Sequence, residues 1–219
     1  MHDSGAQDVD FGLTTRELAM MIKQAGIDFM SLPDGKFDSL MGESSGAAVI
    51  FGATGGVMEA ALRTAYELVT GREVPFENLN ITPVRGMETI RLASVKIEGT
   101  LPEWNFLEGV ELKCAVAHGL ANARELMKKI RAKEIELHFV EVMACPGGCL
   151  GGGGQPIPTT PEIRKKRAEA IYREDEGLPI RKSHENPEII QIYDEFLGKP
   201  LGHKSHELLH TTYKKRERY

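Results

Sequence analysis

Residues 141–156 constrain this chain more than any other stretch. They read Glu-Val-Met-Ala-Cys-Pro-Gly-Gly-Cys-Leu-Gly-Gly-Gly-Gly-Gln-Pro, and they continue an apolar run, residues 137–142, that predicts a buried strand. Glycine adopts backbone angles that other residues avoid, and it lets another group come close to the main chain. Because ordering so many glycines costs chain entropy, we expect a bound group at this loop to offset that cost.

Cys145 and Cys149 are the candidate metal ligands. Three residues separate them, so both thiolates can reach one soft metal centre. The alternative is a glycine-rich surface turn with two buried or disulfide-linked cysteines, because a pair alone does not complete a zinc or iron–sulfur site. A disulfide framework is disfavoured, since the chain has three cysteines and Cys114 lies in an ordinary apolar run. A Walker-type phosphate loop is also disfavoured, because no Gly-Lys-Ser/Thr follows the glycines.

The cysteine stretch resembles a known family. Its pattern is similar to the third cysteine motif of the iron-only ([FeFe]) hydrogenases, as Glu141-x-Met143-x-Cys145-x-Gly-Gly-Cys149-x-x-Gly-Gly-Gly-x-Pro156. Residues 46–63 also resemble the segment of that family that packs against the catalytic cluster. Residues 181–187 and 205–213 look like its C-terminal region. The resemblance therefore implies the C-terminal half of the H-cluster domain of an iron-only hydrogenase large subunit.

The resemblance also implies site residues and a cofactor. By family match, Cys145 would ligate a cubane [4Fe–4S] cluster, and Cys149 would bridge that cluster to a di-iron subcluster. Met143 would pack on the di-iron unit, with Phe51 and the backbone of Gly52 nearby. The activity implied for the complete domain is reversible H2 oxidation and proton reduction.

Two cysteine motifs of the family, Thr-Ser-Cys-Cys-Pro and Pro-Cys-x-x-Lys-x-x-Glu, are missing from this sequence. A cubane normally takes four thiolates, whereas this chain has three, and Cys114 is expected in a strand. We therefore expect an N-terminal hydrogenase lobe or subunit to supply the other cysteines, and the chain alone to be inactive. The surface facing that lobe, with Ile50, Phe51 and Met143, should then be uncovered. A redox partner, either ferredoxin or an NADH-linked subunit, is also implied.

A second class of function stays open, namely a non-catalytic relative that acts as an H2 or redox sensor, a scaffold or a nucleotide-binding protein. Residues 47–51 predict a short strand, and a glycine turn at 52–56 and a helix over 57–69 follow. A phosphate could bind at such a helix N-terminus. The support is weak, because the glycines do not match Gly-x-Gly-x-x-Gly.

The sequence predicts an α/β fold, with a small, mostly parallel sheet flanked by helices and a helical C-terminal wrap. Alternating apolar residues predict an antiparallel pair of strands over 88–98 and 109–117. A helix over 120–132 leads to the strand at 137–142, so that unit is expected to be parallel. We divide the chain into a cluster-binding lobe, 1–156, and a helical extension packed on it, 157–219.

Capping signals predict three more helices. Thr14-Thr-Arg-Glu17 is a capping box, Thr160-Pro161 opens a charged helix to about Arg173, and Asn186-Pro187 opens another. On the predicted helices, the residues expected to face inward are Leu18, Met21, Ile22, Ala25, Leu120, Leu126, Met127, Ile130, Ile189, Ile190, Tyr193 and Phe196.

The histidines of the C-terminal region are interpreted as structural. His206 and His210 are four residues apart and could share a helix face. Because no carboxylate or cysteine at matched spacing completes a metal site, we interpret them and His184 as capping or core-edge residues.

Charge and hydropathy exclude several function classes. The net charge of −5 gives no basis for nucleic-acid binding, and the basic residues at 214–218 are interpreted as a solvated tail. No apolar run reaches the ~18 residues that a membrane span needs, and no signal-peptide pattern is visible at the N-terminus. With three cysteines, these features predict a cytoplasmic protein.

Overall fold

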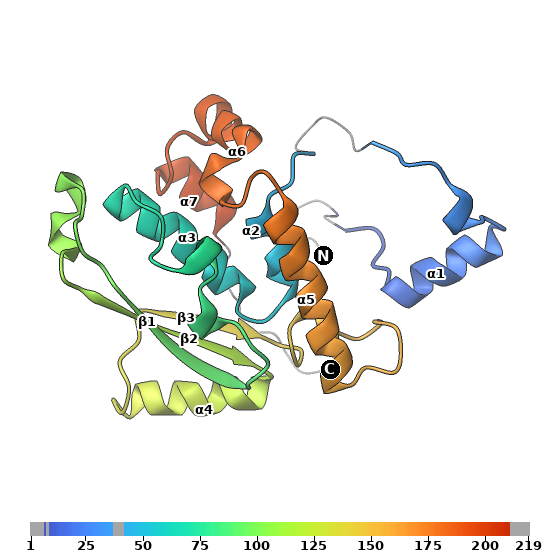
Figure 1. The fold of residues 1–219 in the computed structure, drawn as a ribbon, viewed down its shortest axis with the longest axis horizontal. Coiled ribbons are helices and arrows are strands. Elements are labelled where there is room, and N and C mark those ends of the chain that lie inside the picture. Colours follow the sequence, from blue (N-terminus) through green and yellow to red (C-terminus); the bar gives the residue numbers. More distant parts are fainter. Residues whose placement is uncertain (1–6, 8, 37–41, 211–219) are drawn as a thin grey trace.

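The computed structural model describes residues 7, 9–36 and 42–210. The predicted basic tail and the last residues of the 205–213 segment lie outside this part. Short 3-10 turns and one π-helical turn, Tyr193–Leu197, join the main elements. The helices and strands of the described residues (Figure 1) are α1 Thr15–Gln24, α2 Gly46–Val49, α3 Gly56–Thr70, β1 Ile90–Lys96, β2 Glu111–His118, α4 Leu120–Arg131, β3 Phe139–Met143, α5 Pro161–Gly177, α6 Pro187–Ile192 and α7 His203–Leu209.

The sheet is mixed, with β2 between β1 and β3. β1 is antiparallel to β2, with Val95 opposite Leu112, and β2 is parallel to β3, with Ala117 opposite Val142. The α/β class and the small sheet flanked by helices are confirmed, but the expectation of a mostly parallel sheet is wrong. The connection from β1 to β2 holds only a 3-10 turn, which suits antiparallel strands, whereas α4 provides the crossover that parallel strands need.

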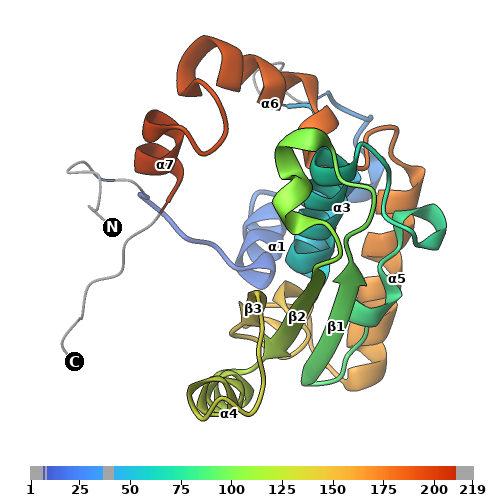
Figure 2. The same ribbon diagram turned by 90° about the vertical axis from the view of Figure 1, so that its left-hand side faces the viewer.

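Both faces of β2 are buried. Cys114 and Val116 pack with α3 on one face, and Ala115 and Ala117 pack with Leu126 of α4 on the other. Figure 2 shows α3 and α4 on opposite sides of the strands. Cys114 is 1% exposed, which confirms the prediction that it is a core residue. The central strand thus fixes the position of β3, which leads into the cysteine loop.

Cys114→Ser is expected to lower the free energy of unfolding by about 1–3 kcal/mol, because it places a hydroxyl in an apolar cluster. Denaturant unfolding of the iron-free chain measures this loss. Cys149→Ser is the control, since Cys149 is exposed and the same atom exchange there should change stability little. Equal losses in the two variants would contradict the core assignment.

Residues 47–51 do not form the predicted strand. They lie in α2 and in the 3-10 turn Ile50–Gly52, and the Ser45 hydroxyl caps α2 by accepting from the Ala48 N–H at 3.3 Å. A short apolar run fits a buried helix as well as a strand. Gly46 also lets Asp175 of α5 pack against the start of α2, since a Cβ on Gly46 would lie 2.0 Å from the Asp175 Oδ1 atom. The helix predicted over residues 57–69 is confirmed as α3.

The predicted inward faces of the helices are only partly covered. On α4, Leu126 is buried, but Leu120 and Met127 are 67% and 41% exposed. Neither α1 nor α6 contains a buried residue. Figure 1 shows α1 apart from the sheet, at the edge of the molecule. An amphipathic pattern predicts an apolar face, but it does not say which element covers that face.

The C-terminal extension begins as predicted. The Thr160 hydroxyl accepts from the Ile163 N–H at 3.3 Å, and α5 runs beyond Arg173 to Gly177, packed against α2 (Figure 1). The Thr14–Glu17 capping box of α1 is also confirmed. Among the described residues, no helix has the length and apolar character to cross a bilayer.

Candidate metal centre

The cysteine loop begins where β3 ends. Cys145 is half-buried, Cys149 is exposed, and Cys149 starts the 3-10 turn Cys149–Gly151. All three cysteines of the chain are free thiols, so the disulfide alternative is wrong. Soft sulfur donors at two points of one loop can bind a thiophilic metal centre.

The loop is held on one side by the turn between α2 and α3. The Thr54 N–H donates to the Gly147 carbonyl at 3.0 Å, and Ala53 forms a β-bridge with Gly148. A Cβ on Gly148 would lie 2.9 Å from the Gly52 carbonyl oxygen. The structure therefore brings the predicted Gly52 segment into contact with the cysteine loop.

Two further side chains fix the loop. The Gly147 N–H donates to His118 Nδ1 at 3.2 Å, and the Arg167 guanidinium donates to the carbonyls of Leu150 and Pro156, each at 2.8 Å. Burial, together with the positive charges of Arg91 and Arg164, lowers the pKa of His118. The neutral ring leaves Nδ1 able to accept. No sequence pattern points to either His118 or Arg167.

Close packing within the protein explains three glycines of this stretch. A Cβ on Gly151 would lie 2.0 Å from the Pro146 carbonyl, one on Gly154 would lie 2.3 Å from the Thr14 Cβ, and one on Gly148 would lie 2.8 Å from the Thr54 nitrogen. These glycines fit the chain's own contacts, so a bound group is not needed to account for them. Gly153 has open space beside it.

Gly151→Ala is therefore expected to unfold the loop or lower the melting temperature by several degrees, because its Cβ meets backbone at 2.0 Å. Gly153→Ala is the matched control, since a Cβ there meets nothing within 4 Å. Thermal unfolding of the two variants measures the difference. If both variants melted with the wild type, the observed packing of the loop would be contradicted.

The other predicted site residues differ in accessibility. Phe51 is 47% exposed in the turn after α2, and Met143 is partly exposed at the end of β3. Ile50 was expected on the same uncovered surface, but it is fully buried in a cluster with Ala47 and Ala60. The correction follows from the helical conformation of this turn, which points Ile50 toward α3.

Glu141 is a buried residue of the motif whose contacts the sequence did not reveal. Its carboxylate accepts from the Gly55 N–H at 2.6 Å and from the Met58 N–H at 2.7 Å, at the start of α3. These donors are the ones a phosphate would use at a helix N-terminus. The nucleotide-binding alternative at 52–56 therefore loses its physical basis. A single acid inside an apolar strand was the signal that could have indicated an internal partner.

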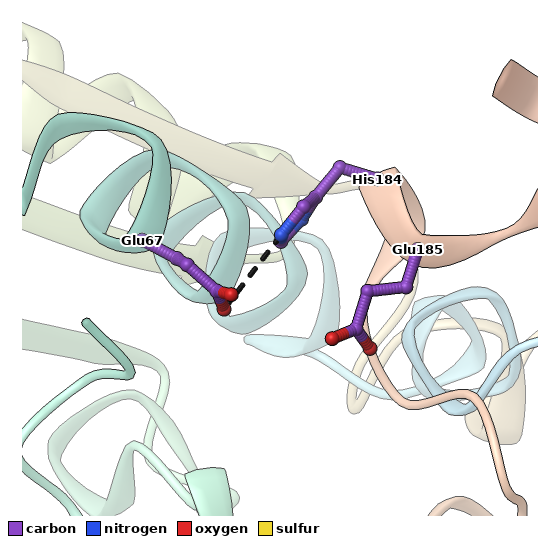
Figure 3. A group of neighbouring side chains, drawn as sticks. All are labelled: Glu67, His184 and Glu185. Carbon is purple, nitrogen blue, oxygen red and sulfur yellow. Dashed lines mark ion pairs between the residues drawn. The ribbon is translucent and has the colours of Figure 1, made fainter. Parts of the chain in front are cut away.

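A second group of side chains of the kinds that can bind metal ions lies away from the cysteines. Glu67, His184 and Glu185 come together between α3 and the turn before α6 (Figure 3). The Lys182 ammonium lies 2.7 Å from Glu67 and 2.8 Å from Glu185, so both acids already pair with a cation of the chain itself. His184 Nδ1 is 3.2 Å from the Thr64 hydroxyl, in agreement with a structural role.

Two family models match most of the chain, one after the other. Residues 1–153 match the family model described as iron only hydrogenase large subunit, C-terminal domain. Residues 161–216 match the model described as iron hydrogenase small subunit. The chain belongs to the iron-only hydrogenase family. The two matches lie on either side of the boundary predicted at residue 156.

Relatives in this family cover nearly all of the chain. The chain is 54% identical over 219 residues to the NADP-reducing hydrogenase subunit HndD of Solidesulfovibrio fructosivorans, covering 98% of this chain and 35% of that one. It is 52% identical over 173 residues to the periplasmic [Fe] hydrogenase large subunit of Nitratidesulfovibrio vulgaris, covering 78% and 38%. A solved structure of the [FeFe]-hydrogenase HydA1 from Chlamydomonas reinhardtii matches with a TM-score of 0.77 and 45% identity.

A more distant relative has a different name. The chain is 28% identical over 213 residues to the cytosolic Fe-S cluster assembly factor narfl of Xenopus tropicalis, covering 94% of this chain and 41% of that one. The chain thus spans 35% to 41% of these curated relatives, and 57% of the solved hydrogenase chain.

Proposed function

We propose that this chain is the C-terminal part of an iron-only hydrogenase catalytic domain and that it contributes Cys145 and Cys149 to the H-cluster, for reversible H2 oxidation and proton reduction. The supporting observation is the position of two free thiols, one exposed and one half-buried, on a loop bridged to the 51–53 turn. Identity of 54% with a hydrogenase subunit over 98% of the chain also supports it.

The residues fit an iron–sulfur centre in their chemistry. Thiolates are the usual ligands of such clusters, and Gly152 lies beside Cys145, where an added Cβ would be in ordinary van der Waals contact with Sγ at 3.8 Å. The third cysteine, Cys114, is in the core at 1% exposure and is not available as a ligand. The chain supplies two of the four thiolates that a cubane takes, and the rest must come from another lobe or subunit.

Each site residue has its own part in this proposal. Cys145 would hold the [4Fe–4S] cluster, and Cys149 would join it to the di-iron subcluster. Met143 and Phe51 would offer apolar surface to the di-iron unit, and Gly52 would keep the neighbouring backbone close. When bound, the centre supplies the redox chemistry of the reaction. His118 and Arg167 hold the loop that presents both thiolates.

A role in iron–sulfur assembly or sensing is the second candidate. The 28% identical relative named as a cluster assembly factor favours it, because similarity to that protein also spans nearly the whole chain. The hydrogenase proposal is preferred, since identity to the hydrogenase subunit is almost twice as high over the same length.

Co-expression tests the proposal. The chain would be produced with an N-terminal hydrogenase half that carries the two missing cysteine motifs, in a host that matures [FeFe] hydrogenases. We expect H2 evolution with reduced methyl viologen from the complex and none from the chain alone. A complex that binds iron and sulfide but evolves no H2 would favour the assembly role.

The remaining assignments are proposals of the same kind. The partner is an N-terminal hydrogenase lobe or subunit, with a ferredoxin or NADH-linked electron carrier. We propose a cluster-binding lobe, 1–156, with the extension 157–219 packed on it. A cytoplasmic location rests on the cysteine count and the sequence pattern, whereas one relative is named as periplasmic.

A further inference from the structure

Glu141 connects the two segments that carry the proposed site residues. It lies on β3, two residues before Met143 and four before Cys145. Its carboxylate accepts from the Gly55 N–H at 2.6 Å and from the Met58 N–H at 2.7 Å, at the start of α3. One side chain therefore ties the strand that leads to the cysteine loop to the turn that carries Phe51 and Gly52.

The environment of Glu141 makes this connection strong. The residue is 6% exposed, and Gly55 is in the left-handed conformation with a φ of 92°. Gly55 in this conformation is the N-cap of α3, so the carboxylate faces the positive end of the α3 dipole. Hydrogen bonds to a buried charged acceptor are about twice as strong as those between neutral groups.

A second charged side chain supports the same turn. Arg91 of β1 is buried, donates to the Thr54 hydroxyl at 3.2 Å and to the Val84 carbonyl at 3.1 Å, and is close enough to Glu141 to interact with its charge. The Thr54 N–H in turn donates to the Gly147 carbonyl of the cysteine loop. Glu141 and Arg91 thus hold the turn in the position where it meets the loop.

We infer that Glu141 is a positioning residue, which sets the cysteine loop against the Phe51–Gly52 turn before any cluster binds. This inference deepens the proposed function and rests on it for its meaning. The contacts that carry it belong to the chain itself, so they can be measured without iron. Glu141 acts through Gly55 and Met58, and we assign it no contact with the cluster.

The test compares Glu141→Gln with Thr70→Val in the iron-free chain. The glutamine side chain keeps one acceptor oxygen and turns an NH2 group toward backbone donors. Thr70 is the matched control, because it is buried at the other end of α3, where its hydroxyl donates to the Tyr66 carbonyl at 2.8 Å and accepts from the Arg72 N–H at 3.2 Å. Thr70→Val thus removes buried hydrogen bonds from the same helix, away from the loop.

Amide hydrogen exchange is the first measurement. In Glu141→Gln we expect exchange at Gly55, Met58 and Thr54 to accelerate about 10- to 100-fold relative to the rest of α3. In Thr70→Val any acceleration should be shared along the helix. Uniform acceleration in both variants would reduce Glu141 to a general stability role and overturn the inference. Acceleration at Gly55 and Met58 without Thr54 would also overturn it, since Glu141 would then cap only the helix.

Thiol alkylation is the second measurement, made by mass spectrometry on the same iron-free samples. Cys145 is half-buried and Cys149 is exposed. A loosened loop should raise the alkylation rate of Cys145 about tenfold in Glu141→Gln and leave that of Cys149 unchanged, with no effect in Thr70→Val. An unchanged Cys145 rate in Glu141→Gln would contradict the inference. Absence of H2 evolution from the wild-type complex would instead refute the proposed function. The hydrogen-exchange and alkylation results would not depend on that outcome.

Discussion

Cys149→Ser is expected to abolish H2 evolution in the complex of this chain with its missing lobe, and Cys145→Ser to prevent stable assembly of the cubane. The thiolates of these two residues are the proposed ligands, and a serine hydroxyl is a poor donor for iron–sulfur clusters. We expect activity to fall at least a thousandfold in both variants, to the level of the chain alone. Methyl-viologen-linked H2 evolution and iron analysis measure activity and loading.

Cys114→Ser provides the control for this prediction. Cys114 is 1% exposed between α3 and the sheet, so its substitution should lower stability and leave the iron content of the folded fraction unchanged. Loss of iron in Cys114→Ser with retention in Cys145→Ser would reverse the ligand assignment. Denaturant unfolding of each variant in its iron-free form measures stability alone. It therefore separates misfolding from the loss of a ligand.

The sequence predicted those parts of the fold in which local signals agree. Capping residues located the starts of α1 and α5, and alternating apolar residues located β1 and β2. A helix between two apolar strands correctly predicted the parallel pairing of β2 with β3. Each of these features depends on neighbours along the chain, and the structure confirms all of them.

The parts that failed depend on contacts between distant segments. Residues 47–51 are helical because they pack beneath α5, and Gly46 meets Asp175, more than a hundred residues away. The apolar pattern of α1 predicts a core-facing stripe, yet α1 has no buried residue. Periodicity indicates which residues share a face, whereas burial is decided by the rest of the molecule.

In the candidate site, too, the sequence located the residues that have a local signal and missed those that depend on distant contacts. The sequence located Cys145, Cys149, Met143, Phe51 and Gly52 through a motif, and their roles stay proposals. The residues that hold the loop, His118 and Arg167, lie in other elements and carry no local signal. The glycines were assigned to ligand approach, but three of them are required by contacts within the protein.

Asp175→Asn is expected to lower the free energy of unfolding by about 3–5 kcal/mol, the cost of removing one partner from a buried ion pair. The Arg63 guanidinium binds both oxygens of Asp175 at 2.8 Å, and Arg181 lies 2.7 Å from one of them. The side chains of Arg63 and Asp175 are both fully buried. Without the Asp175 carboxylate, Arg63 keeps Glu59 as its ion-pair partner among the described residues, and Glu59 is shared with Arg85.

Denaturant unfolding at pH 7 measures the loss. Glu125→Gln is the control, because its partner Lys128 and Glu125 itself are both exposed, so that substitution should change stability little. A loss in Asp175→Asn no larger than in this control would show that the buried pair contributes little to stability.

The same pair predicts how acid acts on the chain. Burial alone would raise the pKa of Asp175, but hydrogen bonds from Arg63 and Arg181 outweigh it, so the pKa is lowered. A carboxyl whose pKa is lower in the folded state stabilises the fold above its unfolded pKa of about 3.9, and the contribution is lost as pH falls further. Asp175→Asn should therefore flatten the fall in stability below about pH 4.

The Arg63–Asp175 pair joins the two parts of the chain that match different family models. Arg63 lies in the part that matches the hydrogenase large subunit, and Asp175 in the part that matches the small subunit. α3 begins at the Gly55–Met58 turn held by Glu141, and Arg63 lies five residues beyond Met58 on the same helix. If Asp175→Asn loosens α5 from α3, alkylation of Cys145 should also accelerate, because α5 carries the Arg167 that binds the cysteine loop. Stability lost with no change at Cys145 would show that the pair does not help to position the cysteine loop.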